Sequence, residues 1–511
     1  MKTKVLQKSL IATLFFIFFS AVLHAQWTQL GSDIDGEEAG DYSGWSVSLS
    51  SDGHTVAIGA YKNDAAGYNN GHVRVYEWSG STWQQKGGDI DGEMAGTWSG
   101  FAVSLSSDGH TVAIGAPYDA GNGIDAGHVR VYEWSGSAWQ QKGSDIDGEE
   151  AGDSSGRSVS LSSDGHIVAI GAPFNGENGS DVGHVRVYEW SGSTWQQKGS
   201  DIDGEGPFGN SGRSVSLSSD GYTVAIGAPY NAGNGQDAGH VRVYEWSGSA
   251  WQQKGSDIDG EAILDVSGWS VSLSSDGHTV AIGAVGNAGN GNDAGHVRVY
   301  EWDGSTWEQK GSDIDGEAAG DYSGWSVSLS SDGHTVAIGA PLDGGNGSDP
   351  GYVRVYEWNG SIWQQKGSDM DGEMAEDRSG NSVSISDDGH TVAIGAPYND
   401  GNGYKAGHVR VYTYPQSTST IPVYMNERGS INVFPNPAEG KISVQIGSPE
   451  YMHADILVYN SVGQLVYYQD CQITVENPAI DIDTRNYTPG AYLLKLITPT
   501  GEQLKKVFLV R

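Results

Sequence analysis

Seven positions, spaced regularly along the chain, carry side chains that could bind a ligand and that differ from one repeat of the sequence to the next. They are Trp45, Phe101, Arg157, Arg213, Trp269, Trp325 and Asn381. Each directly precedes a short apolar strand pattern, and aromatic or arginine side chains there suit stacking on sugars or capturing a peptide. We predict that they ring the mouth of a central channel and bind ligand. The alternative is that they only shield the inner strands from water.

A second candidate site is an acidic segment that begins at Asp33 with the letters DIDGE and also contains Asp35 and Glu37. The segment returns at Asp89, Asp145, Asp201, Asp257, Asp313 and, as DMDGE, at Asp369, a constant step of 56 residues. Alternating carboxylates are the ligands that calcium prefers. We therefore predict a calcium site at Asp33, Asp35 and Glu37 and at their equivalents in the other repeats. The alternative is an Asx-type turn whose carboxylates accept backbone N–H groups.

The histidines also follow the repeat, but they do not predict a catalytic or zinc site. His54 opens one strand pattern and His72 opens the antiparallel one after it, so they lie at opposite ends of a repeat, roughly 20 Å apart at about 3.3 Å per residue. The two cannot share a zinc ion within a repeat, and we expect structural or solvated histidines. Every Ser, His and Asp that could enter a triad recurs in most repeats, which would be unusual for an active site.

Each 56-residue repeat contains four strand patterns. In the first repeat they cover residues 46–50, 55–60, 73–78 and 83–86, with a Ser-Asp-Gly turn after the first. Seven repeats of four antiparallel strands predict an all-β fold, a seven-bladed β-propeller of four-stranded blades. The variable long loops and the acidic connections would then share one face of the disc, and the short turns the other.

The ends of the repeat array predict that the ring closes. The Trp strand occurs seven times, but the last repeat ends at residue 414 without one, and the unmatched copy starts at Trp27. An N-terminal strand that completes the last blade would remove the exposed edge of an open array.

The segments Gly44 to Val47 and Gly115-Ala116-Pro117 resemble the FG-GAP repeat of integrin α-chain propellers and bacterial surface proteins, over residues 27–414. The resemblance implies the same propeller fold. In that family the first hairpin often carries a calcium loop. Here the aligned positions are Ser48, Ser50, Asp52 and Val56, so the calcium site is not expected in this hairpin.

The C-terminal part resembles the type A sorting domain of type IX secretion. Three motifs carry the resemblance, at residues 433–437 (VFPNP), 458–463 (VYNSVG) and 487–492 (YTPGAY), followed by a basic strand at 504–511. The resemblance implies a Bacteroidota-type bacterium, passage through the outer membrane and the secretion machinery as a partner. Alternating apolar strands with Gly and Pro turns predict a small β-sandwich here.

The remaining features set the domain boundaries and exclude some partners. Lys2, Lys4 and Lys8 before an apolar run predict a signal peptide over residues 1–25. We expect the propeller over 26–414, a linker over 415–430 and the sorting domain over 431–511. No other segment is apolar enough to span a membrane. A net charge of −36 argues against nucleic acid as a partner, and Cys471 is the only cysteine, so no intramolecular disulfide can form.

These features together predict a secreted or cell-surface protein that is not an enzyme. We expect it to recognise an extracellular glycan or protein through the variable long-loop face, in a binding or adhesion role. Two alternatives remain. One is a secreted polysaccharide-active enzyme in which Arg157 and Arg213 bind an acidic sugar, since some enzymes also have a propeller fold. The other is a structural spacer without a small ligand.

Overall fold

The computed structural model describes residues 25–342 and 350–415 and, nearer the C-terminus, residues 431–434, 441–446, 452–460, 465–473, 479–485, 490–498 and 501–509. It divides into two compact units, Met1–Pro415 and Gln416–Arg511. The predicted signal peptide and linker lie almost entirely outside the described residues, as do parts of the sorting-domain motifs. Within the described ranges no helix is long and apolar enough to cross a membrane.

The first unit is the predicted all-β propeller of seven antiparallel sheets. Its inner strands are β3 (Ser46–Leu49), β8 (Ala102–Leu105), β13 (Ser158–Leu161), β18 (Ser214–Leu217), β23 (Ser267–Leu273), β28 (Ser326–Leu329) and β33 (Ser382–Ile385). The second strands are β4 (Thr55–Ala60), β9 (Thr111–Ala116), β14 (Ile167–Ala172), β19 (Thr223–Ala228), β24 (Thr279–Ala284), β29 (Thr335–Ala340) and β34 (Thr391–Ala396). The third strands are β5 (His72–Trp78), β10 (His128–Trp134), β15 (His184–Trp190), β20 (His240–Trp246), β25 (His296–Trp302), β30 (Tyr352–Trp358) and β35 (His408–Thr413).

The outermost strands are short and carry the Trp pattern. They are β6 (Trp83–Gln85), β11 (Trp139–Gln141), β16 (Trp195–Gln197), β21 (Trp251–Gln253), β26 (Trp307–Gln309), β31 (Trp363–Gln365) and, for the last blade, β1 (Thr28–Gln29). A fifth strand of two residues, which the sequence did not predict, also pairs with the third strand of each blade. These are β7 (Ile90–Asp91), β12 (Ile146–Asp147), β17 (Ile202–Asp203), β22 (Ile258–Asp259), β27 (Ile314–Asp315), β32 (Met370–Asp371) and β2 (Ile34–Asp35).

The apolar core lies between neighbouring blades. Val47 and Leu49 of the first blade pack against Val409 and Val411 of the last blade in one buried cluster. Equivalent clusters lie between the other blades. The alternation of valine and leucine with serine in the inner strand therefore places one apolar face in each of these interfaces.

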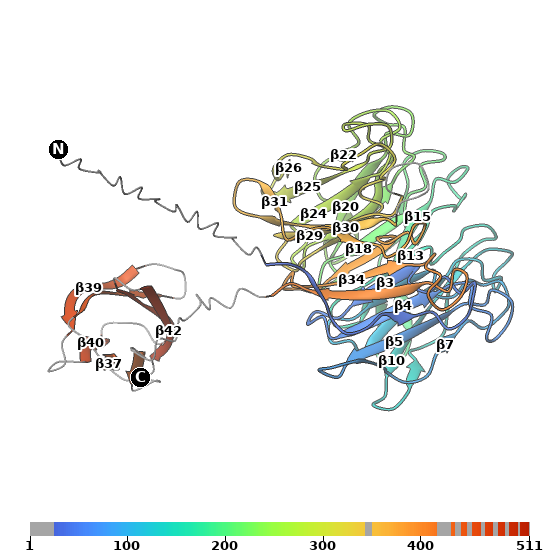
Figure 1. Cartoon of the computed structure of the whole chain (residues 1–511). Helices are drawn as coiled ribbons and strands as arrows, with labels where there is room; N and C mark the ends of the chain where they lie inside the picture. The colour runs from blue at the N-terminus through green and yellow to red at the C-terminus, as the bar shows by residue number, and fades with distance from the viewer. Residues whose placement is uncertain are drawn as a thin grey trace, which may run out of the picture. The chain divides into compact units, whose positions relative to one another are not determined.

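The N-terminal strands complete the last blade, as the unmatched Trp strand predicted. β1 pairs with β35 through Thr28 opposite Thr413, and β2 pairs with the same strand through Ile34 opposite Val409. The Trp27 Nε1 atom donates to the Lys366 carbonyl at 2.6 Å, as the other outer tryptophans do to the preceding blade. Figure 1 shows the first and last blades side by side, with β3 and β4 in blue next to β34 in orange. The ring is closed by strand pairing between its two ends.

Hydrogen bonds between inner hairpin turns also link the seven blades. The Ser51 N–H donates to the Ser107 carbonyl at 2.9 Å, and each next turn repeats this bond until Asp387 donates to Ser51. The turns are Ser51, Ser107, Ser163, Ser219, Ser275, Ser331 and Asp387. This cycle narrows the short-turn end of the central channel.

Glycines allow the blades to approach closely where the second strand of one blade meets the chain that enters the next. A Cβ atom on Gly115 would overlap the carbonyl oxygen of Gly156 in the following blade, and the same overlap recurs between Gly59 and Gly100. Only glycine fits there without moving the backbone.

We expect Gly115→Ala to lower the free energy of unfolding by about 1–3 kcal/mol, because overpacking must push two blades apart. Gly88→Ala is the matched control, since a Cβ on Gly88 has open space around it and neither glycine has a positive φ. Chemical denaturation of both variants measures the difference. Equal stabilities of Gly115→Ala and Gly88→Ala would contradict the close approach.

The described residues of the second unit form two antiparallel sheets, in agreement with the predicted small β-sandwich. One sheet joins β36 (Ile431–Phe434), β37 (Lys441–Ile446) and β40 (Ala479–Asp483). The other joins β39 (Leu465–Ile473), β38 (Met452–Tyr459), β41 (Gly490–Thr498) and β42 (Gly501–Leu509). Ile442, Ile482, Ile456 and Leu494 are buried, so each sheet covers an apolar face.

Candidate functional site

The structure places all seven predicted ligand-binding residues around one cavity at the mouth of the propeller channel. The cavity holds about 250 Å³, and its rim is formed by Trp45, Phe101, Arg157, Arg213, Trp269, Trp325 and Asn381. The next residues of the inner strands line its depth. Six rim residues lie one position before an inner strand and Trp269 lies within β23, so the sevenfold repeat brings together side chains that are 56 residues apart in the chain.

The rim residues contact one another in chain order. Trp45 and Phe101 have ring centroids 5.6 Å apart, and the Arg157 guanidinium lies 5.0 Å from the Phe101 centroid. The Arg213 guanidinium lies 4.2 Å from Trp269, whose ring is 4.9 Å from that of Trp325. These contacts place the two arginines next to each other, with Phe101 on one side and Trp269 on the other.

Asn381 lies between the two ends of this series. Its Nδ2 atom donates to the Trp45 carbonyl at 3.1 Å, and its buried Oδ1 atom has no hydrogen-bond partner among the described residues. The site therefore has a cationic side at the two arginines and an amide on the opposite side.

The two rim arginines differ from the arginines of the third strands because they have no carboxylate partner among the described residues. Each arginine of the third strands pairs with a glutamate, as Arg74 does with Glu37 at 3.6 Å. Within the described part of the chain, neither Arg157 nor Arg213 forms an ion pair, and the cavity lining contains no carboxylate. Burial and then the neighbouring Arg157 lower the pKa of Arg213 to about 9, so Arg213 remains charged at neutral pH. In a chain of net charge −36, this cavity is locally positive.

A second set of variable residues supports the rim and was missed in the sequence. The set lies three positions earlier and includes Tyr42, Trp98, Tyr322 and Arg378. All four residues have positive φ angles, which turn the chain into the inner strand. The signal available in the sequence was that this position varies between repeats as much as the rim position does.

Aromatic rings extend from the rim over the first two blades. Tyr61 lies 4.7 Å from Trp45 and 4.9 Å from Trp98, and Trp98 lies 4.4 Å from Tyr118. Burial raises the pKa of Tyr61. The long loop after the second strand therefore contributes to the same surface as the rim.

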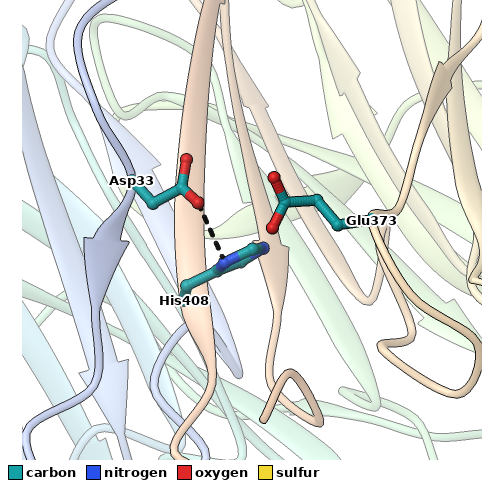
Figure 2. Close-up of side chains that lie close together, drawn as sticks. All are labelled: Asp33, Glu373 and His408. Carbon is teal, nitrogen blue, oxygen red and sulfur yellow. Dashed lines mark ion pairs between the residues drawn. The ribbon is translucent and has the colours of Figure 1, made fainter. Parts of the chain in front are cut away.

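The predicted calcium ligands are divided between two places in the structure. Asp33 lies near Glu373 and His408, whereas Glu37 lies near His72 and Asp89. Figure 2 shows the first of these clusters, with both carboxylates directed toward the imidazole. The predicted calcium ligands are divided because Ile34 and Asp35 form an extended strand, which separates Asp33 from Glu37. Asp35 instead uses its carbonyl to accept a hydrogen bond from Arg74 at 2.6 Å.

The two kinds of histidine occupy different environments. His54 is exposed and lies 3.2 Å from Asp52, whereas His72 is fully buried at the opposite end of the blade. Burial, with a smaller contribution from Arg74, lowers the pKa of His72 to about 4, so its imidazole is neutral at physiological pH. The prediction that His54 and His72 lie far apart agrees with this geometry. The carboxylates near His72 come from the acidic connections between blades.

Comparison with known protein families gives two matches. A model described as the FG-GAP repeat matches residues 34–76, 309–356 and 364–412. The chain carries FG-GAP repeats. A model described as a secretion system C-terminal sorting domain matches residues 432–510. The sorting domain indicates a protein that type IX secretion machinery of a Bacteroidota-type bacterium delivers outside the cell or to the outer-membrane surface.

In these FG-GAP repeats the two motif glycines have a structural role. Gly100 and Gly156 precede inner strands, and Gly59 and Gly115 are the next-to-last residues of second strands. They are the glycines that contact each other between blades. In the first hairpin Asp52 Oδ1 accepts hydrogen bonds from Ser50 Oγ and the His54 N–H. Burial raises the pKa of Asp52, but these bonds outweigh it and lower the pKa below its usual value. The hairpin carboxylate therefore stabilises the turn.

Solved structures similar to the FG-GAP propeller chain have low sequence identity to it, and no curated protein sequence matches the chain. A proposed 6-phosphogluconolactonase from Bacteroides uniformis is 12% identical over 84% of this chain and 99% of that one, with a TM-score of 0.47. Raptor from Chaetomium thermophilum is 11% identical over 76% of this chain and 29% of that one, with a TM-score of 0.49. At these identities neither bears on the function of the chain.

Proposed function

We propose that this secreted or surface propeller is a non-enzymatic binding protein that recognises an acidic glycan at the mouth of its channel. The observation that carries the proposal is the pair Arg157 and Arg213, which are charged, adjacent and without an ion-pair partner among the described residues, in a cavity without carboxylates. A guanidinium presents a planar fork of donors that matches a carboxylate or a sulfate.

Aromatic contacts support the same proposal. Stacking on Phe101 and Trp269 fixes the two guanidinium planes, so less conformational entropy is lost when an anion binds. Trp45 and Trp325 are partly exposed at the rim, where their faces can stack on sugar rings. The cavity volume of about 250 Å³ is just below the usual range for small-molecule sites. The cavity therefore suits the terminal sugar of a glycan better than a whole oligosaccharide.

The lining also favours binding without turnover. It is made of tryptophan, phenylalanine, alanine, valine, serine, arginine and asparagine, so the described residues around the cavity offer no Asp, Glu or His as a general acid or base. Glycoside hydrolysis usually needs a pair of carboxyl groups.

The test is binding of the full chain to an array of neutral, uronic acid-containing and sulfated oligosaccharides, with extracellular proteins on the same array. We expect retention on acidic glycans that weakens as salt rises, and no new reducing ends during incubation with them. Selective retention on neutral sugars or on proteins would contradict the glycan proposal, and turnover of a retained glycan would make the chain an enzyme. Absence of any retention would favour a structural spacer.

A further inference from the structure

Among the described residues of the propeller, six clusters each hold three possible metal ligands close together. Five of them are Asp33, Glu373 and His408; Glu37, His72 and Asp89; His128, Asp145 and Asp147; Glu149, His184 and Asp201; and Glu205, His240 and Asp257. In four of these five a buried histidine at the start of a third strand lies between a glutamate and an aspartate from two successive acidic connections.

Most of the imidazoles in these clusters lack hydrogen bonds that a buried histidine normally makes; His128 differs, because its Nδ1 lies 3.3 Å from Asp119 Oδ1. His72 and His184 are 0% exposed, and neither of their ring nitrogens has a hydrogen-bond partner among the described residues. The Nε2 atoms of His240, His296 and His408 are also buried and unpartnered. Buried polar atoms in proteins usually have a hydrogen-bond partner. Because these nitrogens repeatedly lack one, we expect a ligand that binds to imidazole nitrogen.

The distances within the clusters are those of ligands that share an ion. His72 Nδ1 lies 4.0 Å from Glu37 Oε2 and 3.9 Å from Asp89 Oδ2. His184 Nδ1 lies 3.9 Å from both Glu149 and Asp201. These separations are too long for hydrogen bonds. Two ligand atoms that each lie about 2.0–2.2 Å from one zinc ion are roughly 3.3–4.2 Å apart, depending on the coordination angle.

We propose that these clusters bind divalent transition-metal ions, with Zn²⁺ as the ion that best fits one imidazole and two carboxylates. Calcium prefers an all-oxygen shell of six to eight ligands, whereas imidazole suits zinc. Each cluster would hold the ion with three protein ligands and leave a position for water. Glu37 can contribute Oε2 to the ion while its Oε1 stays 3.6 Å from Arg74.

Four of the five clusters join neighbouring blades, whereas His128, Asp145 and Asp147 all belong to the second blade. Glu37 lies in the connection that leaves the last blade, whereas His72 and Asp89 belong to the first blade. Asp33 precedes β2, so the cluster with His408 and Glu373 includes the N-terminal segment that closes the ring (Figure 2). Bound ions would therefore act as cross-links around the long-loop end of the propeller.

One blade provides a natural exception. Tyr352 occupies the position of the histidine, and its hydroxyl donates to Asp321 at 2.9 Å. The flanking Glu317 and Asp369 are the repeat equivalents of Glu37 and Asp89. This blade retains both carboxylates but has no imidazole.

The test is the zinc content of the untagged full chain, measured by elemental mass spectrometry after chelation, reloading with Zn²⁺ and removal of free ion. We expect about six equivalents per chain, one for each cluster. His72→Ala and His184→Ala should each lose one equivalent, and the double variant two. His54→Ala, which removes an exposed histidine at the other end of the blade, should lose none.

Tyr352→His gives a readout that does not depend on damage to the fold, because we expect it to gain one equivalent. We also expect zinc, but not calcium, to raise the melting temperature of the chelated chain. Zinc content that is near zero, or that is the same in wild type and in the His72→Ala, His184→Ala double variant, would overturn the proposal. A shift with calcium alone would overturn it too.

Discussion

Replacing Arg157 and Arg213 together by alanine will weaken binding of an acidic oligosaccharide about 100-fold or more. A hydrogen bond to a charged group contributes about 1.5–3 kcal/mol, and the double variant removes at least two such bonds. The expected cause is loss of the positive charge in a cavity whose described lining has no other cation. Titration calorimetry with the acidic glycan identified on the array measures the change.

The control is Lys405→Ala. Lys405 also lies beside an aromatic ring, 4.9 Å from the Tyr398 centroid, but it does not line the cavity. We expect this variant to bind within about threefold of wild type. Equal losses in the double variant and in Lys405→Ala would mean that general surface charge, and not the channel mouth, attracts the glycan.

Trp27→Ala will destabilise the propeller as much as Trp83→Ala does, although Trp27 lies at the N-terminal edge of the repeat array. Both indoles donate to a carbonyl of the preceding blade, Trp27 to Lys366 at 2.6 Å and Trp83 to Leu30 at 2.8 Å. Both are partly buried against a core cluster. We expect each change to lower the free energy of unfolding by about 2 kcal/mol, from lost apolar burial and one lost hydrogen bond.

Removal of residues 26–35 should have a larger effect, on the order of 5 kcal/mol, because it also exposes the edge of β35 and removes the buried Ile34 from the core. Denaturant unfolding followed by tryptophan fluorescence measures all three variants. A stability loss for Trp83→Ala with none for Trp27→Ala or the truncation would show that the ring is open in solution.

Much of the fold can be predicted from the sequence, because the strands depend on local residue patterns and the arrangement of the blades depends on the repeat. The step of 56 residues and the alternation in Ser46–Leu49 specify the blade, and the unmatched Trp27 specifies closure. The rim of the cavity could be predicted for the same reason, since Trp45 and its equivalents vary at one position next to the innermost strand.

The histidine clusters could not be predicted in the same way. Glu37, His72 and Asp89 meet only because the connection that leaves one blade passes over the third strand of the next. The sequence spacing of these residues matches no standard ligand motif, and the rotation between blades decides the distance. The contact between Gly115 and Gly156 depends on the same rotation, so the sequence shows the glycines but not the reason for them.

The most direct test of the proposed ligand site is a crystal structure of the chain with the tightest acidic oligosaccharide from the array. We predict density for a terminal sugar in the channel mouth, with its carboxylate or sulfate within hydrogen-bonding distance of Arg157 and Arg213 and a sugar ring against Trp45 or Trp325. Density for the sugar elsewhere, such as on the short-turn face, with an empty channel mouth would contradict the proposed function.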